Sequence, residues 1–183
     1  NILISKKSGA VFFTGLCEQK HPLGANSIKS PLNLDDDHFV YTSPEQTGRI
    51  NWTIDQRSDL YSLGAVFYEM LSGEVPFNYK DRLRTIHAHL ASEPNTLLLS
   101  RQDLPYTINQ IVLKLLSKGG EDRYQSASGL LKDLENCRTQ YKTERWIKPF
   151  ELARKDNIDR FQIPSKLYGA EKNMVTLFES FNR

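Results

Sequence analysis

Apolar residues recur three and four positions apart over residues 57–72, and this spacing predicts an α-helix. Further apolar side chains widen the face until it nearly surrounds the helix, so we expect this helix to be buried. Gly73 can end a helix in a left-handed conformation, and Pro76 cannot continue one. The strongest hydrophobic pattern in the chain therefore predicts one central helix with a sharp end.

Weaker, one-sided patterns predict three more helices. They run over residues 81–91, from Thr107 to just before Gly119, and over residues 126–141. Thr107 and Gln110 have the spacing of a capping box, in which each side chain bonds the backbone of the other residue. We therefore expect Thr107 to cap the second of these helices.

The first part of the chain has a different pattern. Residues 1–5 and 10–13 read as two short strands separated by a turn, which predicts a hairpin. Residues 15–37 lack periodicity and form a long loop, a feature that in compact domains is usually functional or disordered. The pattern as a whole predicts a mainly α fold, in which a short β-hairpin precedes a bundle of helices.

Composition narrows the classes of protein that fit. The 183 residues are 39% hydrophobic and 25% charged, which is enough to build a core. A net charge of +2 gives no global field for nucleic acid or for an anionic membrane. Two distant cysteines favour a reducing compartment, and no apolar run is long enough to span a bilayer. We therefore expect a cytoplasmic protein with no nucleic-acid or membrane contact. Because the chain opens on Asn1 and a strand-like run, we also expect a fragment that is truncated at its N-terminus.

Three short blocks stand in a fixed order around the central helix, at residues 41–46, 59–64 and 73–77. Singly they are weak signals, because Ser-Pro-Glu is a common surface turn and an aspartate before an apolar helix is usually a cap. Together they resemble the large, C-terminal lobe of protein kinases. The Ser-Pro-Glu of the first block matches the Ala-Pro-Glu signature of that lobe.

The resemblance implies structural roles for these residues. In kinases the arginine at the position of Arg123 pairs with the glutamate at the position of Glu45, and a guanidinium fork can hold that carboxylate bidentately. The aspartate at the position of Asp59 opens the central helix and accepts hydrogen bonds from the catalytic-loop backbone. The structural signature comprises Ser43, Pro44, Glu45, Asp59, Gly64 and Arg123.

The sequence is similar to one subgroup in particular. Residues 43–49 and 121–127 resemble the Ser/Thr-kinase-like domains of multi-domain hybrid sensor histidine kinases, in which an AAA-type ATPase module follows. Residues 159–169 resemble the entry into that module.

This resemblance implies a domain organisation. A kinase-like lobe would occupy residues 1–145, with the activation segment at about residues 15–45. A linker would occupy residues 146–164, and the ATPase module would begin within residues 165–183.

Catalytic residues carry over only in part. Asn1 resembles the asparagine that binds a second Mg²⁺, because its amide oxygen suits a hard cation, and Leu3 resembles the floor of the adenine pocket. Without the blocks downstream, these residues would read simply as the start of a strand. Phe13 stands at the position of the metal-binding aspartate, and a phenyl ring cannot ligate Mg²⁺. The set is therefore incomplete, and the chain alone is expected to be inactive and to hold no cofactor.

Three functions remain open at this point. In the first, the parent domain binds ATP and Mg²⁺ and phosphorylates serine or threonine in a protein substrate, together with the missing N-terminal lobe. In the second, it is a pseudokinase that acts as a scaffold or regulator for the ATPase and histidine-kinase modules of the same signalling chain. The third is an unrelated helical interaction domain, which the absence of a contact between Glu45 and Arg123 would favour.

Overall fold

The computed structural model describes residues 2–4, 11–13, 37–154 and 156, which fall into two units, Asn1–Asp36 and Asp37–Arg183. In the first unit, strands β1 (Ile2–Ile4) and β2 (Val11–Phe13) pair antiparallel, with Ile2 opposite Phe13. The predicted hairpin is confirmed. Asn1, most of the predicted activation segment and the predicted ATPase entry lie outside the described residues.

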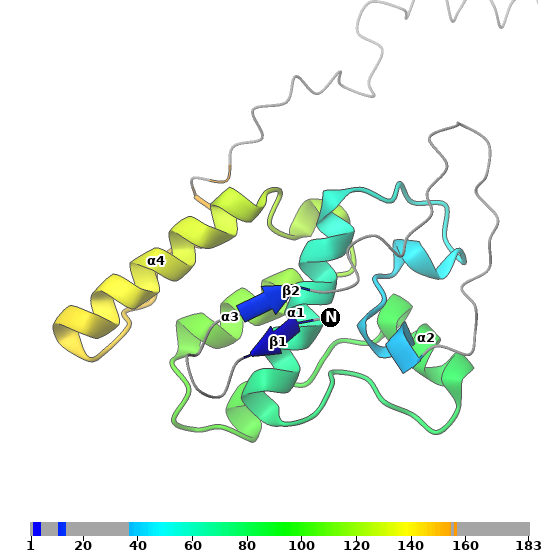
Figure 1. The fold of residues 1–183 in the computed structure, drawn as a ribbon, viewed down its shortest axis with the longest axis horizontal. Helices are drawn as coiled ribbons and strands as arrows, with labels where there is room; N and C mark the ends of the chain where they lie inside the picture. The colour runs from blue at the N-terminus through cyan, green and yellow to red at the C-terminus, as the bar shows by residue number, and fades with distance from the viewer. Residues whose placement is uncertain (1, 5–10, 14–36, 155, 157–183) are drawn as a thin grey trace, which may run out of the picture. The chain divides into compact units, whose positions relative to one another are not determined.

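The described part of the second unit is helical (Figure 1). It contains four α-helices and several short 3-10 helices, labelled η. Their order along the chain is η1 (Asp37–Tyr41), η2 (Glu45–Thr47), α1 (Gln56–Ser72), α2 (Arg82–Ala91), η3 (Leu97–Leu99), α3 (Tyr106–Leu115), η4 (Gly120–Asp122) and α4 (Ala127–Glu144). Together with the hairpin, these elements confirm the predicted mainly α fold.

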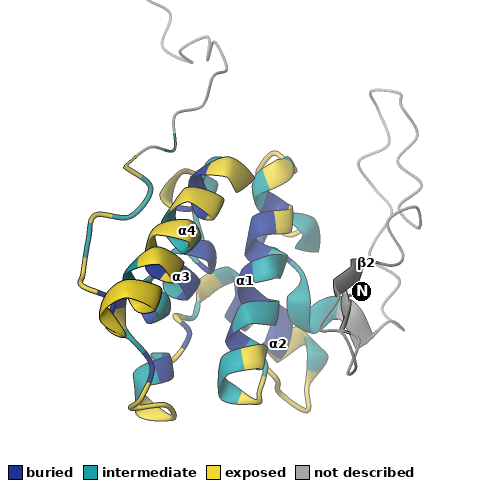
Figure 2. Cartoon of the chain, turned by 60° about the vertical axis from the view of Figure 1, so that its left-hand side comes forward, coloured by how far each residue is buried: buried dark blue, intermediate teal, exposed yellow. Residues whose placement is uncertain are grey.

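Helix α1 is the central element, as its apolar pattern predicts. It begins after Asp55, whose Oδ1 accepts a hydrogen bond from the backbone N–H of Arg57 at 2.9 Å, as an N-cap does. It ends at Gly73, where φ is +84° and the N–H donates to the carbonyl of Glu69. Tyr61 and Ala65 have no exposed surface, and Figure 2 shows the buried colour along this helix. The cap is therefore Asp55, and Asp59 lies inside the first turn.

Gly64 explains how closely α1 approaches α3. A Cβ atom on Gly64 would lie 2.7 Å from the Cβ of Leu115 and 3.3 Å from the Cγ of Leu116. A separation of 2.7 Å is shorter than packed carbon atoms adopt, so a side chain here would push the two helices apart. The glycine permits the close crossing on which the core depends.

Two clusters of buried side chains form the core of the second unit. One lies between α1, α3 and α4 and comprises Leu60, Ile111, Leu115, Tyr124, Leu130, Cys137 and Ile147. The other comprises Tyr61, Ala65, Tyr68, Leu97, Leu104, Val112 and Leu116, and Phe67 and Ile108 pack against both. Both clusters use α1 and α3, so these two helices hold the unit together.

The capping box predicted at Thr107 is wrong. Helix α3 begins one residue earlier, at Tyr106, after Pro105, and no side chain caps it. Thr107 is instead buried in the first turn, and its hydroxyl faces the carbonyl of Lys148 at 3.5 Å. The ring of Pro105 fixes a backbone φ that suits the start of a helix, and Pro105 has no backbone N–H that would need an acceptor. The local capping pattern at Thr107 is therefore overridden by the contact with Lys148, which is distant in sequence.

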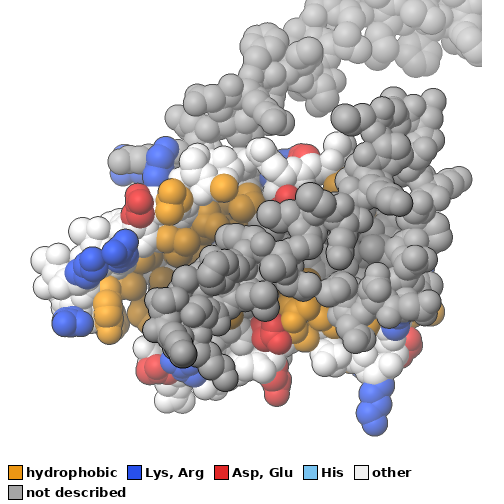
Figure 3. Space-filling model, in the orientation of Figure 1, with side chains coloured by type: hydrophobic (Ala, Val, Ile, Leu, Met, Phe, Trp, Pro, Cys, Tyr) orange, Lys and Arg blue, Asp and Glu red, His pale blue; other side chains and the backbone are white. Residues whose placement is uncertain are grey.

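Helix α4 is covered on one side only. Leu131 and Tyr141 are 54% and 50% exposed, and hydrophobic side chains show along this helix between basic ones (Figure 3). Among the described residues, no helix combines the length and apolar character needed to cross a membrane.

Candidate functional site

A buried ion pair joins two segments 78 positions apart in the sequence. Glu45 begins η2 and Arg123 follows η4, and the two side chains are 5% and 0% exposed. Nη1 of Arg123 donates to Oε1 of Glu45 at 2.7 Å, and Nη2 donates to Oε2 at 2.9 Å. The contact expected between these residues is formed, and it is bidentate.

The guanidinium of Arg123 has all five of its N–H donors engaged. Beyond the carboxylate, Nε donates to the carbonyl of Ser117 at 2.8 Å, Nη1 to that of Arg57 at 3.0 Å and Nη2 to that of Lys118 at 2.8 Å. Its carbon lies 4.9 Å from the centre of the Tyr61 ring. Arg123 therefore fixes the end of α3 to the start of α1, and lysine could not take its place.

The carboxylate of Glu45 stays ionised in this setting. Burial alone raises the pKa of Glu45, but the hydrogen bonds from Arg123 and from the Ser58 hydroxyl, at 2.6 Å, lower it, and the net shift is downward. A glutamate with a lowered pKa contributes stability above its ordinary pKa, and that stability is lost as the pH falls through the folded value. The pair is thus a fixed structural bond at neutral pH.

Ser43 lies next to Glu45 in the sequence, and its side chain is enclosed. It has no exposed surface, and its hydroxyl donates to the Oε1 of Gln46 at 2.9 Å. The backbone N–H of Ser43 donates to the same oxygen at 3.1 Å. Pro44 forms the N-cap of η2, and Gly48 ends it with φ at +67°. The Ser-Pro-Glu block therefore makes a closed turn that presents Glu45 to Arg123.

Asp59 and the nucleotide residues do not join this centre. Asp59 is exposed on α1, and its side chain makes no hydrogen bond among the described residues. Leu3 and Phe13 lie on the strands of the hairpin, in the other unit, and Asn1 lies outside the described residues. In the part of the chain that the structure describes, no group of His, Cys, Asp and Glu is arranged to hold a metal ion. The roles expected for Asn1, Leu3 and Phe13 stay predictions.

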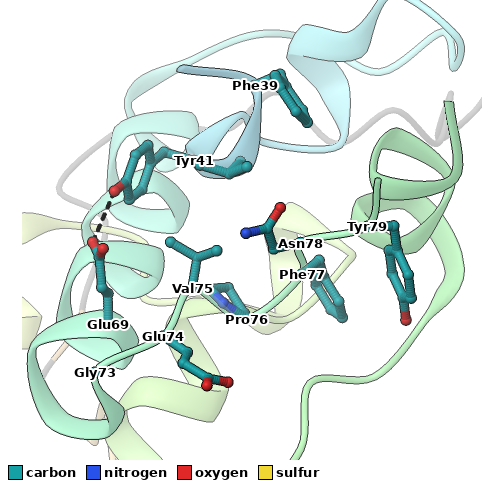
Figure 4. Close-up of a pocket in the computed structure, with 11 residues that line it drawn as sticks. Phe39, Tyr41, Glu69, Gly73, Glu74, Val75, Pro76, Phe77, Asn78 and Tyr79 are labelled. Atoms are coloured by element: carbon teal, nitrogen blue, oxygen red, sulfur yellow. Dashed lines mark hydrogen bonds between the residues drawn. The ribbon is translucent and has the colours of Figure 1, made fainter. Parts of the chain in front are cut away.

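Sequence reasoning missed an open groove of about 770 Å³ (Figure 4). Its walls are η1 on one side and the connection after α1 on the other, and its lining includes Phe39, Tyr41, Glu69, Glu74, Val75 and Phe77. The hydroxyl of Tyr41 donates to Oε2 of Glu69 at 2.8 Å across the groove. Burial and this carboxylate raise the pKa of Tyr41 to about 12. The lining carries two carboxylates, and basic side chains stack on its aromatic rings: Arg82 on Phe39, Arg84 on Tyr79 and Lys118 on Phe77.

His89 forms a second buried polar contact beneath the groove. Its ring has no exposed surface, and Nδ1 lies 2.9 Å from the hydroxyl of Tyr61. Nε2 is buried with no hydrogen-bonding partner of good geometry among the described residues. The ammonium of Lys118 lies 4.5 Å from the centre of the Phe77 ring, against which His89 packs edge-on. Burial, and then the charge of Lys118, lower the pKa of His89 to about 4, against a smaller opposing effect of the Val40 carbonyl.

Comparison with known proteins places this arrangement in context. The chain is 36% identical over 165 residues to hybrid signal transduction histidine kinase G of Dictyostelium discoideum, covering 79% of the chain. It is 30% identical over 171 residues, or 92% of the chain, to the peroxide stress-activated histidine kinase mak3 of Schizosaccharomyces pombe. It is 38% identical over 94 residues, or 51% of the chain, to the serine/threonine-protein kinase PknB of Mycobacterium tuberculosis, of which it spans 15%. A search against models of protein families finds no match.

These relationships and the buried ion pair define the class: the helical unit is a protein-kinase-like large lobe. The chain is homologous both to Ser/Thr protein kinases and to hybrid histidine kinases, and the histidine kinases match most of its length. It spans only 5% and 7% of the two histidine kinases.

Proposed function

We propose that this chain is part of a kinase-like domain that has lost phosphoryl transfer and acts as a regulatory module within a larger signalling protein. The observation that carries the proposal is Phe13, which stands at the end of β2 where kinases have their metal-binding aspartate. Phosphoryl transfer depends on Mg²⁺ to neutralise charge on the phosphates, and a phenyl ring offers no oxygen ligand.

The retained ion pair supports a role that requires the fold. Glu45 and Arg123 hold the lobe together whether or not the domain transfers phosphate, so their presence fits a lobe that still serves as a platform. The partners implied are an N-terminal kinase lobe and an AAA-type ATPase module in the same protein. The open groove next to η1 offers a place for a segment of a partner protein.

An active Ser/Thr kinase is the second candidate. The relatives named as Ser/Thr kinases favour it, since they match about half of this chain, 55% and 51% of its length. In that case ATP and Mg²⁺ are the cofactors, Leu3 forms the floor of the adenine pocket, and Asn1 binds a Mg²⁺ ion.

The two candidates differ in the effect of Mg²⁺ on nucleotide binding. In the kinase-like domain expressed with its N-terminal lobe, we expect Mg²⁺ to leave the affinity for ATP unchanged within about twofold, because the metal lacks its carboxylate ligand. The matched variant Phe13→Asp supplies that carboxylate and should make ATP binding dependent on Mg²⁺. Calorimetric titration of both forms with and without Mg²⁺ measures the difference. Strong Mg²⁺ dependence in the unaltered domain would decide for the active kinase.

A further inference from the structure

The segment after α4 turns back and runs along that helix (Figure 2). The turn is made at Arg145, which has φ at +56°, and residues 146–154 and 156 then lie against the lobe; we call these residues the latch. Ile147 is 6% exposed and belongs to the core cluster that contains Cys137. The backbone N–H of Lys148 donates to Oε1 of Gln140 at 2.9 Å. This part of the predicted linker is therefore docked on the helical unit.

Two carboxylates hold the far end of the latch. Oδ2 of Asp133, on α4, accepts from the Tyr124 hydroxyl at 2.8 Å and from the backbone N–H of Ala153 at 2.7 Å. Asp156 accepts from the hydroxyl of Ser126, the N-cap of α4, at 2.6 Å and from the backbone N–H of Gln125. A carboxylate at a helix N-terminus is further stabilised by the helix dipole.

Gly129 makes room for the carboxylate of Asp156. A Cβ atom on Gly129 would overlap the side chain of Asp156. A glycine in a helix costs about 1 kcal/mol relative to alanine, so the first turn of α4 gives up intrinsic stability at the position where the latch docks.

Gln125 connects the latch to the signature ion pair. Its backbone N–H bonds Asp156, its Oε1 accepts from Nη1 of Arg57 at 3.0 Å, and its Nε2 donates to the carbonyl of Arg123 at 2.8 Å. The carbonyl of Arg57 in turn accepts from Arg123, which holds Glu45. One continuous set of hydrogen bonds thus runs from Asp156 to Glu45.

The latch buries few apolar side chains. Ile147 is its one fully buried apolar side chain, and Phe150, Leu152 and Ala153 are half-buried. Ala153 has φ at +60°, a conformation that costs free energy in a residue other than glycine. Segments with few buried apolar contacts detach from a protein at a lower free-energy cost than the unfolding of its core.

We propose that the latch is a detachable strap that couples the chain leaving the lobe to the turn that carries Glu45. When the latch detaches, Gln125 loses the carboxylate that orients its backbone, and the bonds from Gln125 to Arg57 and Arg123 weaken. The ordering of the Ser-Pro-Glu turn then follows the state of the latch. The inference rests on the contacts of the lobe and does not depend on whether the domain transfers phosphate.

Two variants open the latch by different routes. Asp156→Ala removes the carboxylate, while Gly129→Ala keeps it and fills its place, at the same time favouring the α4 helix. Glu151→Ala is the matched control, since Glu151 is an exposed acidic residue of the same segment with no hydrogen bond among the described residues. Cys137 serves as the reporter of opening: its thiol is buried in the core cluster to which Ile147 of the latch also belongs, so we expect it to become accessible to alkylation when the latch lifts.

In the full-length protein we expect both variants to raise the rate of alkylation of Cys137, read on its own peptide by mass spectrometry, by about tenfold over the control. Amide exchange of residues 43–47 should rise in parallel, while that of Ala65 and Val112 in the core stays unchanged. Faster exchange in the core as well would mean that the variant unfolds the lobe, and the proposal would fail for that variant. Faster alkylation with unchanged exchange at residues 43–47 would show a docked segment without coupling and would overturn the proposal.

Discussion

Replacing Arg123 by alanine is expected to destabilise the helical unit by about 3–5 kcal/mol, the usual cost of breaking a buried ion pair by removing one partner. The change strands the carboxylate of Glu45 and leaves the carbonyls of Ser117, Arg57 and Lys118 without their donor. Chemical denaturation followed by circular dichroism measures the loss. Arg123→Lys should recover little of it, because an ammonium cannot reach both oxygens and three carbonyls at once.

The control is an ion pair of the same chemistry on the surface. Arg101 also binds its partner, Asp103, bidentately, at 2.8 Å for both contacts, but the two side chains are 45% and 69% exposed. Solvent and salt screen such a pair, so Arg101→Ala should change the unfolding free energy little. Equal losses in the two variants would contradict the structural role assigned to the pair of Glu45 and Arg123.

The second large effect depends on pH and on His89. The folded pKa of about 4 lies below the ordinary value of 6.5, so the unfolded chain binds a proton at a pH where the folded chain does not. The stability from neutral His89 is therefore fully present above the ordinary pKa and is lost as the pH falls below it. Lowering the pH from 7 to 5 should cost about 2 kcal/mol of unfolding free energy through this residue.

His87 provides the control on the same helix. It is exposed, whereas His89 has no exposed surface. His89→Gln should flatten the dependence of unfolding free energy on pH between 7 and 5, and His87→Gln should leave it as it is. Denaturation at several pH values measures both slopes. A slope that His89→Gln leaves unchanged would mean that the buried ring is not the group that titrates.

The sequence was sufficient to predict two kinds of feature: helices with a periodic apolar pattern, and contacts between residues of motifs that stand in a fixed order. The apolar spacing of residues 57–72 predicted a buried helix, and Gly73 predicted its end. The order of the motifs predicted that Glu45 and Arg123 meet, although no local pattern connects them. The resemblance to the kinase lobe named Arg123 as the partner, and the chemistry agrees, because a buried carboxylate requires a cation.

Features that arise from contacts between irregular segments were not predictable in the same way. Residues 146–154 have no periodicity, and nothing local shows that Ile147 enters the core or that Asp133 holds Ala153. The groove is formed by η1 and the loop after α1, so its shape depends on tertiary structure. The capping box at Thr107 has the correct local spacing, but the helix begins after Pro105, and the Thr107 hydroxyl bonds the carbonyl of Lys148 instead.

The most direct test of the central claim, a kinase-like lobe kept without its chemistry, is phosphate transfer. In the kinase-like domain expressed with the N-terminal lobe proposed above, and without the other modules proposed above, incorporation of labelled phosphate from ATP into serine or threonine is measured with and without the change Asn1→Ala. We expect both forms to give the same background level, because in our proposal Phe13 takes the place of the carboxylate that would bind Mg²⁺. Robust transfer that disappears with Asn1→Ala would contradict the account and show an active kinase.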